Sequence, residues 1–168
     1  MKRFLAGVVF GLSIGMGLLA VPKGSSTQQP ASPPSFVQYL RGTDQQNNRA
    51  YSPAVISSGG KIVWLAGQTA LVDSNGKSLA GDFDAQAKEV FAQIDRTLKR
   101  VGGSLESVVT WTVFINDPRH GDQLIKIRQG MFPDGKFPGS ALITVSHFAQ
   151  PGVLIEIQAV AVLADQRM

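Results

Sequence analysis

The segment Val108–Ile115 (VVTWTVFI) is predicted to be a β-strand without a polar side. All eight of its residues are β-branched or aromatic, which is the composition that strands favour. Successive side chains of a strand point to opposite faces, so both faces of this strand consist of residues that proteins usually bury. A sheet that contains it therefore needs a cover on each side.

Two predicted helices can cover one side. The first begins at Asp82, which can cap it, and ends at Gly102-Gly103, while the second runs from about Gly121 to Met131. Apolar residues recur along the first helix at the spacing of one helical face, and they are Phe83, Ala87, Val90, Phe91, Ile94, Leu98 and Val101. We therefore expect this helix to pack one apolar face on a sheet.

Four more segments are predicted to be strands, at residues 54–57, 61–67, 141–147 and 153–163. The first two are expected to pair across the turn at residues 58–60 (SGG). The order β-β-α-β-α-β-β predicts an α/β (α+β) domain, a sheet with two helices on one face. Two helices are too few to cover both faces, so we expect the bare face to pack against another copy of the chain.

The first 21 residues have the layout of a secretory signal. Lys2 and Arg3 precede an uncharged run over residues 4–21. The run has 18 residues, near the lower limit of about 17–25 for a membrane span, so a retained N-terminal anchor is the alternative. Ala20 offers a cleavage position, but Leu18 is large where a small residue is preferred, so cleavage and tethering both stay open. We expect export to the periplasm or the medium, with membrane contact only through an uncleaved segment.

Residues 22–35 (PKGSSTQQPASPPS) are a predicted linker, since they lack large apolar side chains and are rich in Pro, Ser and Gln. The folded domain is expected over residues 36–165. Of the 16 basic residues, Lys2 and Arg3 lie in the signal, which leaves 14 against 12 acidic residues and a net charge of +2. This weak balance gives no electrostatic case for nucleic acid as a partner.

Metal and thiol chemistry find no support in the sequence. The chain has no cysteine and two histidines, His120 and His147, which lie on different predicted elements. No carboxylates accompany these histidines at the spacing of metal ligands, so a metal site is not expected.

Glu156 is at odds with its surroundings. It lies inside the apolar run Val153–Val162 (VLIEIQAVAV), where a carboxylate is costly unless it is paired or hydrogen-bonded. It is predicted to line a site, where it can act as a general acid or base, or to lie at a polar seam between subunits. A solvated edge position is the third possibility. Tyr51 is a second candidate, which either covers the core or presents its phenol to a pocket.

Several short motifs follow one another in a recognisable order. They are Tyr51-Ser52-Pro53-Ala54, Ala66-Gly67-Gln68, Val108–Phe114 followed by Asp117, Phe137-Pro138, and Ile155–Ala161 (IEIQAVA). Their order and spacing resemble the Rid/YjgF (RidA) family of reactive-intermediate deaminases, over about residues 50–163. The resemblance implies a chorismate-mutase-like fold and a homotrimer with barrel-like packing of the sheets. It also implies that small-molecule ligands bind in clefts between subunits.

An activity and a set of site residues are implied as well. Members of the family hydrolyse reactive 2-enamine and 2-imine acids to 2-keto acids and ammonia, without a cofactor. By position, Tyr51 and Glu156 correspond to the catalytic tyrosine and glutamate of the cleft, and Gly67 to a glycine whose backbone approaches the ligand. Ser140 stands where the family has an arginine that binds the substrate carboxylate. Arg128 could compensate if its helix turns it into the cleft, so Gly67, Ser140 and Arg128 are the predicted substrate-binding residues.

Two functions are open on this basis. One is a RidA-like enamine/imine deaminase with altered substrate range, which Glu156 favours. The other is a non-catalytic small-ligand-binding protein that uses the same intersubunit cleft, and a structural or chaperone-like role is a third hypothesis. Ser140 argues against the usual carboxylate substrates, so we expect weak hydrolysis of 2-iminopropanoate or none, and we expect Ser140→Arg to raise it.

Overall fold

The computed structural model describes residues 36–164. The predicted export signal and linker, residues 1–35, lie outside the described residues, as do residues 165–168. The elements are, in chain order, β1 (Phe36–Tyr39), α1 (Asp44–Asn48), β2 (Val55–Ser58), β3 (Lys61–Trp64), α2 (Phe83–Lys99), η1 (Leu105–Ser107), β4 (Val108–Ile115), η2 (Pro118–His120), α3 (Gly121–Met131), β5 (Gly139–Thr144) and β6 (Ile155–Leu163). Within residues 36–164, no helix has the length and apolar character that crossing a membrane requires.

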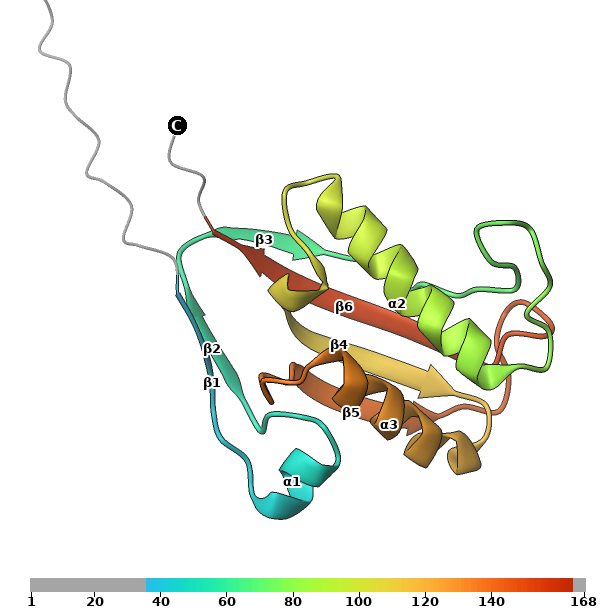
Figure 1. Ribbon diagram of the computed structural model, residues 1–168, viewed down its shortest axis with the longest axis horizontal. Helices are drawn as coiled ribbons and strands as arrows, with labels where there is room; N and C mark the ends of the chain where they lie inside the picture. The colour runs from blue at the N-terminus through green and yellow to red at the C-terminus, as the bar shows by residue number, and fades with distance from the viewer. Residues whose placement is uncertain (1–35, 165–168) are drawn as a thin grey trace, which may run out of the picture. The chain divides into compact units, whose positions relative to one another are not determined.

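Four strands form a mixed sheet in the order β3-β6-β4-β5 (Figure 1). β6 runs antiparallel to both of its neighbours, β3 and β4, whereas β4 and β5 are parallel. The last strand of the chain is thus inserted between two strands that α2 connects, and α3 makes the crossover from β4 to β5. The predicted α+β class is confirmed.

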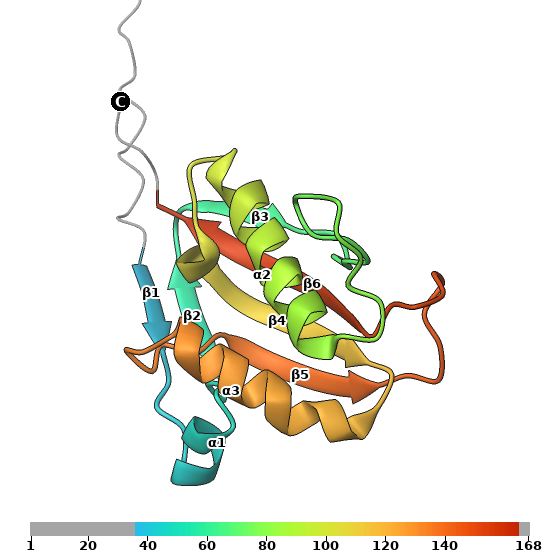
Figure 2. The same ribbon diagram turned by 45° about the vertical axis from the view of Figure 1, so that its right-hand side comes forward.

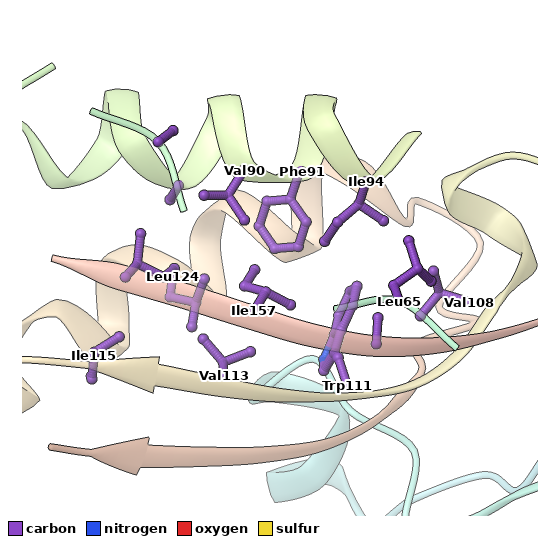
Figure 3. Packing of buried hydrophobic residues seen from close by; sticks show 14 of the residues in the cluster. Leu65, Val90, Phe91, Ile94, Val108, Trp111, Val113, Ile115, Leu124 and Ile157 are labelled. Carbon is purple, nitrogen blue, oxygen red and sulfur yellow. The ribbon is translucent and has the colours of Figure 1, made fainter. Parts of the chain in front are cut away.

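Both long helices lie on the same face of this sheet (Figures 1 and 2). From α2, Val90, Phe91 and Ile94 point toward Trp111 of β4 and Ile157 of β6 (Figure 3). All five side chains are buried in one core. Burial of each such side chain stabilises the fold by about 1.5–3 kcal/mol, so the packing of α2 on the sheet is a main source of stability.

The ends of α2 follow the prediction. At its start, the backbone N–H of Ala85 donates to the Asp82 side chain at 3.0 Å. After its last turn, the backbone N–H of Gly103 donates to the carbonyl of Leu98 at 2.9 Å, and Gly102 has a φ of 86°. This φ lies in the left-handed region that glycine adopts without steric cost, which explains the predicted stop. The bounds of α3 also agree with the predicted helix.

The predicted hairpin between residues 54–57 and 61–67 is wrong. β2 pairs with β1, and β3 pairs with β6. A Cβ on Gly60 would lie 2.5 Å from the carbonyl oxygen of Leu163, so the turn passes close against the end of β6 and delivers β3 to that strand. β1 and α1 were not predicted: β1 follows directly on the Pro/Ser-rich segment, and α1 (DQQNN) has no apolar residue from which a period could be read.

The opposite face of the sheet carries large apolar side chains that are open to solvent. Ile62 and Trp64 of β3 are 55 % and 77 % exposed, and Ile143 of β5 is 43 % exposed. A monomer gains nothing from leaving these side chains in water. That this face packs against another copy in a trimer stays a prediction.

Candidate functional site

Glu156 lies on the uncovered face of the sheet, because its strand neighbours Ile155 and Ile157 point into the core. Its side chain is half-buried and lies against Gly67, in the segment that follows β3. A Cβ at Gly67 would be 2.9 Å from Cδ of Glu156 and would overlap the nearer carboxylate oxygen. Only glycine leaves this space to the carboxylate.

The backbone around Gly67 is tied to β6. Leu65 N donates to the carbonyl of Ala159 at 2.9 Å, and Gln68 N donates to the carbonyl of Ile157 at 2.9 Å. The advance from Leu65 to Gln68 is three residues, whereas the advance from Ala159 to Ile157 is two. One extra residue on one strand is the geometry of a β-bulge. Bulges re-aim the chain locally, and this one places Gly67 beneath the carboxylate.

Apolar and neutral polar residues surround Glu156 on the open face. Glu156 pairs with Phe114 of β4, and Phe114 pairs with Ile143 of β5. Two residues further along β6, Gln158 pairs with Thr112. The ion pairs among residues 36–164 lie elsewhere. In the described part of one chain, this carboxylate has no cation beside it.

Gln86 of α2 fixes the chain that leads into β6. Its buried amide donates to the carbonyls of Leu79 at 3.1 Å and Gly152 at 2.9 Å, and accepts from Leu154 N at 2.9 Å. Leu154 lies two residues before Glu156, so this helix residue sets where the functional strand begins. This role of Gln86 was not predicted, although a polar residue on the apolar face of a predicted helix is a recognisable signal.

Arg128 and Ser140 form a second polar group, on the helix side of the sheet. The Arg128 guanidinium donates to Ser140 Oγ at 2.7 Å and to the carbonyl of Arg49 at 3.2 Å. It is 2 % exposed and lies 6.0 Å from the ring centroid of Trp111. Burial, with repulsion from Arg49, lowers the pKa of Arg128 to about 10. The group is therefore a buried cation packed on an indole.

Tyr51 lies beside the start of β5. The next residue, Ser52, donates its backbone N–H to the carbonyl of Pro138 at 3.3 Å and bridges Gly139 in parallel register. Ala50 before it has a φ of 55°, so the chain turns sharply between α1 and Tyr51. Tyr51 is half-buried. This turn brings Tyr51 to the end of the sheet where Ser140 lies.

The structure divides the predicted site residues into two groups. One group consists of Gly67 and Glu156, and the other gathers at the start of β5 and consists of Tyr51, Arg128 and Ser140. Ser140 pairs with Trp111 and Glu156 with Phe114, three residues apart along β4. That offset is about 10 Å, and because it is odd it also places the two side chains on opposite faces. One small ligand cannot contact both groups of the same chain, so the catalytic and substrate-binding roles stay predictions.

A cleft of about 450 Å³ lies away from both groups, between β1, η1 and the loop that follows α3. Tyr39 and Glu106 are among its lining residues. Burial first, and then the charge of Glu106, raises the pKa of Tyr39. No cluster of His, Cys, Asp or Glu in residues 36–164 is arranged to hold a metal ion. The cleft and the predicted site residues therefore lie in different parts of the described structure.

The fold and these side chains define a class of protein: an α+β domain whose mixed sheet has two helices on one face and a carboxylate on the other. Residues 43–163 match the family described as Endoribonuclease L-PSP. The chain therefore belongs to this family, which is also known as Rid, YjgF or RutC, and the resemblance stated above is confirmed.

Curated relatives and solved structures agree with this membership. A RutC family protein of Pyrococcus horikoshii is 30 % identical over 111 residues, which are 66 % of this chain and 85 % of the relative. Protein DfrA of Myxococcus xanthus is 31 % identical over 112 residues, 67 % of this chain and 84 % of the relative.

Two solved structures share the fold. A Rid family protein of unknown function from Yersinia pestis matches with a TM-score of 0.66 at 23 % identity, over 77 % of this chain and 98 % of that chain. A YjgF family member from Mycobacterium tuberculosis matches with a TM-score of 0.53 at 24 % identity, over 76 % of this chain and all of that chain.

Proposed function

We propose that the protein is an enamine/imine hydrolase, a deaminase of small reactive molecules, and that Glu156 is its acid–base residue. The observation that carries this proposal is the half-buried carboxylate, seated on Gly67 with no cation beside it in its own chain. Water adds to the carbon of a C=N bond, and the resulting amino alcohol loses ammonia to leave a carbonyl compound. A carboxylate can take the proton from the attacking water and return it to the leaving nitrogen. This sequence balances without a cofactor.

We infer that the reaction takes place between copies of the chain. Glu156 and Gly67 lie on the face that exposes Trp64, whereas Ser140 faces the helix side at the start of the edge strand β5, with Tyr51 beside it. If the β5 edge of a second copy meets the exposed face, one copy can supply the carboxylate and its neighbour the tyrosine and serine. A homotrimer closes such contacts in a ring, so every copy would take part in two clefts.

The test is an imine hydrolysis assay. An amino-acid oxidase generates 2-iminopropanoate from alanine, semicarbazide traps what remains, and the loss of trapped imine reports hydrolysis. Because Ser140 replaces the arginine, we expect a weak acceleration by the wild type, and we expect Glu156→Gln to abolish it. Glu106→Gln, the same change at an exposed site on η1, is the control. Full activity of Glu156→Gln in a folded protein would show that Glu156 is not the acid–base residue and has at most a role at a polar contact between subunits.

A non-catalytic binding protein is the second candidate. Ser140 favours it, because the hydroxyl already accepts a hydrogen bond from Arg128 and replaces the arginine that the family resemblance implies. A protein of this kind would bind a small ligand in the same cleft, and no ammonia would appear on prolonged incubation with imine.

We also propose that the protein works outside the cytoplasm. Lys2, Arg3 and the uncharged residues 4–21 support export. Fractionation of cells that express the full chain, with protease added to the outer side of the inner membrane, tests this. Recovery in the cytoplasm alone would end the proposal.

A further inference from the structure

The cleft between β1, η1 and the loop after α3 has the size of a small-molecule site. Its volume is about 450 Å³, and ligand pockets usually have about 300–1,000 Å³. The walls come from β1, η1, residues 131–136 and the end of β6. Side chains from these separate parts of the chain meet around the cleft without filling it, and the proposed hydrolysis at Glu156 does not use it.

Two walls of the cleft are held in place by hydrogen bonds within the chain. The turn η1 is tied to α2, because the backbone N–H of Leu105 donates to the Asp95 side chain at 2.9 Å. Opposite η1, the backbone N–H of Gly135 donates to the carbonyl of Phe132 at 3.0 Å and closes a tight turn. Gly135 has a φ of 68°, which glycine adopts without steric cost. The cleft is therefore largely preformed, and a preorganised site loses less entropy when a ligand binds.

Aromatic and thioether side chains form the apolar part of the cleft. Phe36 and Tyr39 line it from β1, and Met131 and Phe132 line it from the end of α3. The ring of Phe132 packs edge-on against Trp111 at 5.7 Å between centroids, so the core fixes its position. Rings of this kind attract the apolar body of a ligand, and their faces also attract a cation.

The charged groups of the lining favour a positive ligand. Glu106 and Asp134 contribute two carboxylates, whereas Lys136 contributes one ammonium group on an exposed, flexible side chain. The ion pairs of residues 36–164 involve other residues, so neither carboxylate has an ion-pair partner in the described part of the chain. Burial first, and then the charge of Glu106, raises the pKa of Tyr39, so a negative charge is disfavoured at the phenol.

We propose that this cleft binds a small organic cation, an amine whose protonated nitrogen is attached to an apolar or aromatic body. Glu106 accepts hydrogen bonds from the nitrogen, and such charge-assisted bonds are about twice as strong as neutral ones. The apolar body packs on Met131 and Phe132, and the ring of Tyr39 contributes a cation–π contact. The site lies apart from Gly67 and Glu156, so the inference goes beyond the proposed function and does not rest on it.

The probe is 2-phenylethylamine, which is protonated at neutral pH and has an aromatic body. Calorimetric titration of the full chain, purified in mild detergent at low ionic strength, should show saturable binding after subtraction of a titration into detergent alone. 2-Phenylethanol has nearly the same shape without the charge and should bind about tenfold or more weakly. 3-Phenylpropanoate carries a negative charge and should show no measurable binding.

Three variants test which residues carry the binding. Glu106→Gln keeps the size of the side chain and removes its charge, so the affinity for 2-phenylethylamine should fall about tenfold or more. Tyr39→Leu removes the ring and should lower the affinity about three- to tenfold. Asp122→Asn removes an exposed carboxylate at the start of α3, the end of the helix away from the cleft, and should leave the affinity unchanged.

Several outcomes would overturn the inference. They are failure of 2-phenylethylamine to bind, binding of 2-phenylethanol with equal affinity, or unchanged affinity in Glu106→Gln. An equal loss in Asp122→Asn and Glu106→Gln would show attraction to the surface charge in general and would also contradict the site. Glu106 is exposed, so its variant stays informative even if Tyr39→Leu does not fold. Loss of amine binding in Glu106→Gln with imine hydrolysis intact would show that the two sites are independent, as the inference requires.

Discussion

The carboxylate of Glu156 occupies the space that a side chain at Gly67 would fill. A Cβ at Gly67 would lie 2.9 Å from Cδ and 3.2 Å from Cγ of Glu156, both closer than ordinary van der Waals contact. Contact between these two residues links the bulge after β3 to the one acidic position inside β6. The conformation of the carboxylate therefore depends on the absence of a single methyl group.

Gly67→Ala is expected to displace the carboxylate and to lower imine hydrolysis about as far as Glu156→Gln does. The overlap involves the flexible end of the glutamate, which can rotate away, so the free energy of unfolding should fall by only about 1–2 kcal/mol. Hydrolysis rates and chemical denaturation of the same samples separate the two effects.

The control is Gly130→Ala, near the end of α3, where a Cβ would meet no atom within 4 Å. This change should leave hydrolysis intact and stabilise the protein by up to about 1 kcal/mol. In the double variant Gly67→Ala/Glu156→Gln the losses should not add, because both changes remove the same group. Additive losses would show that Gly67 acts without the carboxylate.

The sequence was sufficient for the elements that long periods define. The helix that Asp82 caps and the strand over residues 108–115 were predicted with nearly their observed bounds. Burial requires an apolar residue at every second position of a strand face and at every third or fourth position of a helix face. The partner of β3 was not predictable. Its pairing with β6 rather than β2 depends on how the turn at Gly60 packs against Leu163, a contact between residues about a hundred positions apart.

Gln86→Leu is expected to lower the free energy of unfolding by about 2–5 kcal/mol. The carbonyl of Leu79 loses a buried partner, which costs about 1–3 kcal/mol, and the carbonyl of Gly152 and the N–H of Leu154 lose part-buried hydrogen bonds that water partly replaces. Denaturant titration measures the loss. Gln129→Leu, which removes one exposed hydrogen bond to the carbonyl of Asn48, should change stability by less than about 0.5 kcal/mol. Similar losses at both positions would contradict the role of Gln86 in fixing the chain that leads into β6.

Trp64→Glu is expected to prevent association of the chain. Trp64 is 77 % exposed, and Ile62, on the same face of β3, is 55 % exposed. A charge at position 64 would have to be desolvated in any contact that covers this face. Light scattering of the full chain in detergent, corrected for the micelle, should give a trimer for the wild type and a smaller mass for the variant. Val101→Glu changes an apolar residue that is 47 % exposed in the turn after α2 and should keep the trimer. A monomeric wild type would contradict the packing argument itself.

The candidate site was predicted as a set of residues but not as an arrangement. Glu156 was found because a carboxylate inside an apolar strand has few explanations, and Gly67 because of the family resemblance. Their contact, and the separation of Ser140 from them, depend on strand order and on which face each residue takes. Arg128 was considered for the cleft, but only the packing of α3 on β5 shows that its guanidinium donates to Ser140.

Ser140→Arg alone is now expected to destabilise the protein. The sequence suggested that arginine here would raise the hydrolysis of 2-iminopropanoate, but Ser140 Oγ lies 2.7 Å from a nitrogen of the Arg128 guanidinium. Two unit charges 4 Å apart repel by about 4 kcal/mol at an effective dielectric constant of 20, and extension of the new side chain toward solvent reduces this cost. We therefore expect a loss of about 1–3 kcal/mol in the free energy of unfolding, with little gain in hydrolysis.

The double variant Ser140→Arg/Arg128→Gln removes the repulsion and keeps a neutral donor at position 128. Its stability should return to within about 1 kcal/mol of the wild type, since one buried charge replaces another. A guanidinium at position 140 can bind a carboxylate through two parallel hydrogen bonds, so hydrolysis of 2-iminopropanoate should rise above the wild-type rate by about tenfold or more. Denaturation of the two single variants and the double variant, with hydrolysis measured on each, gives the coupling between the positions. If Ser140→Arg alone is as stable and as active as the double variant, the two guanidinium groups do not compete for one space, and Arg128 is no part of the ligand site.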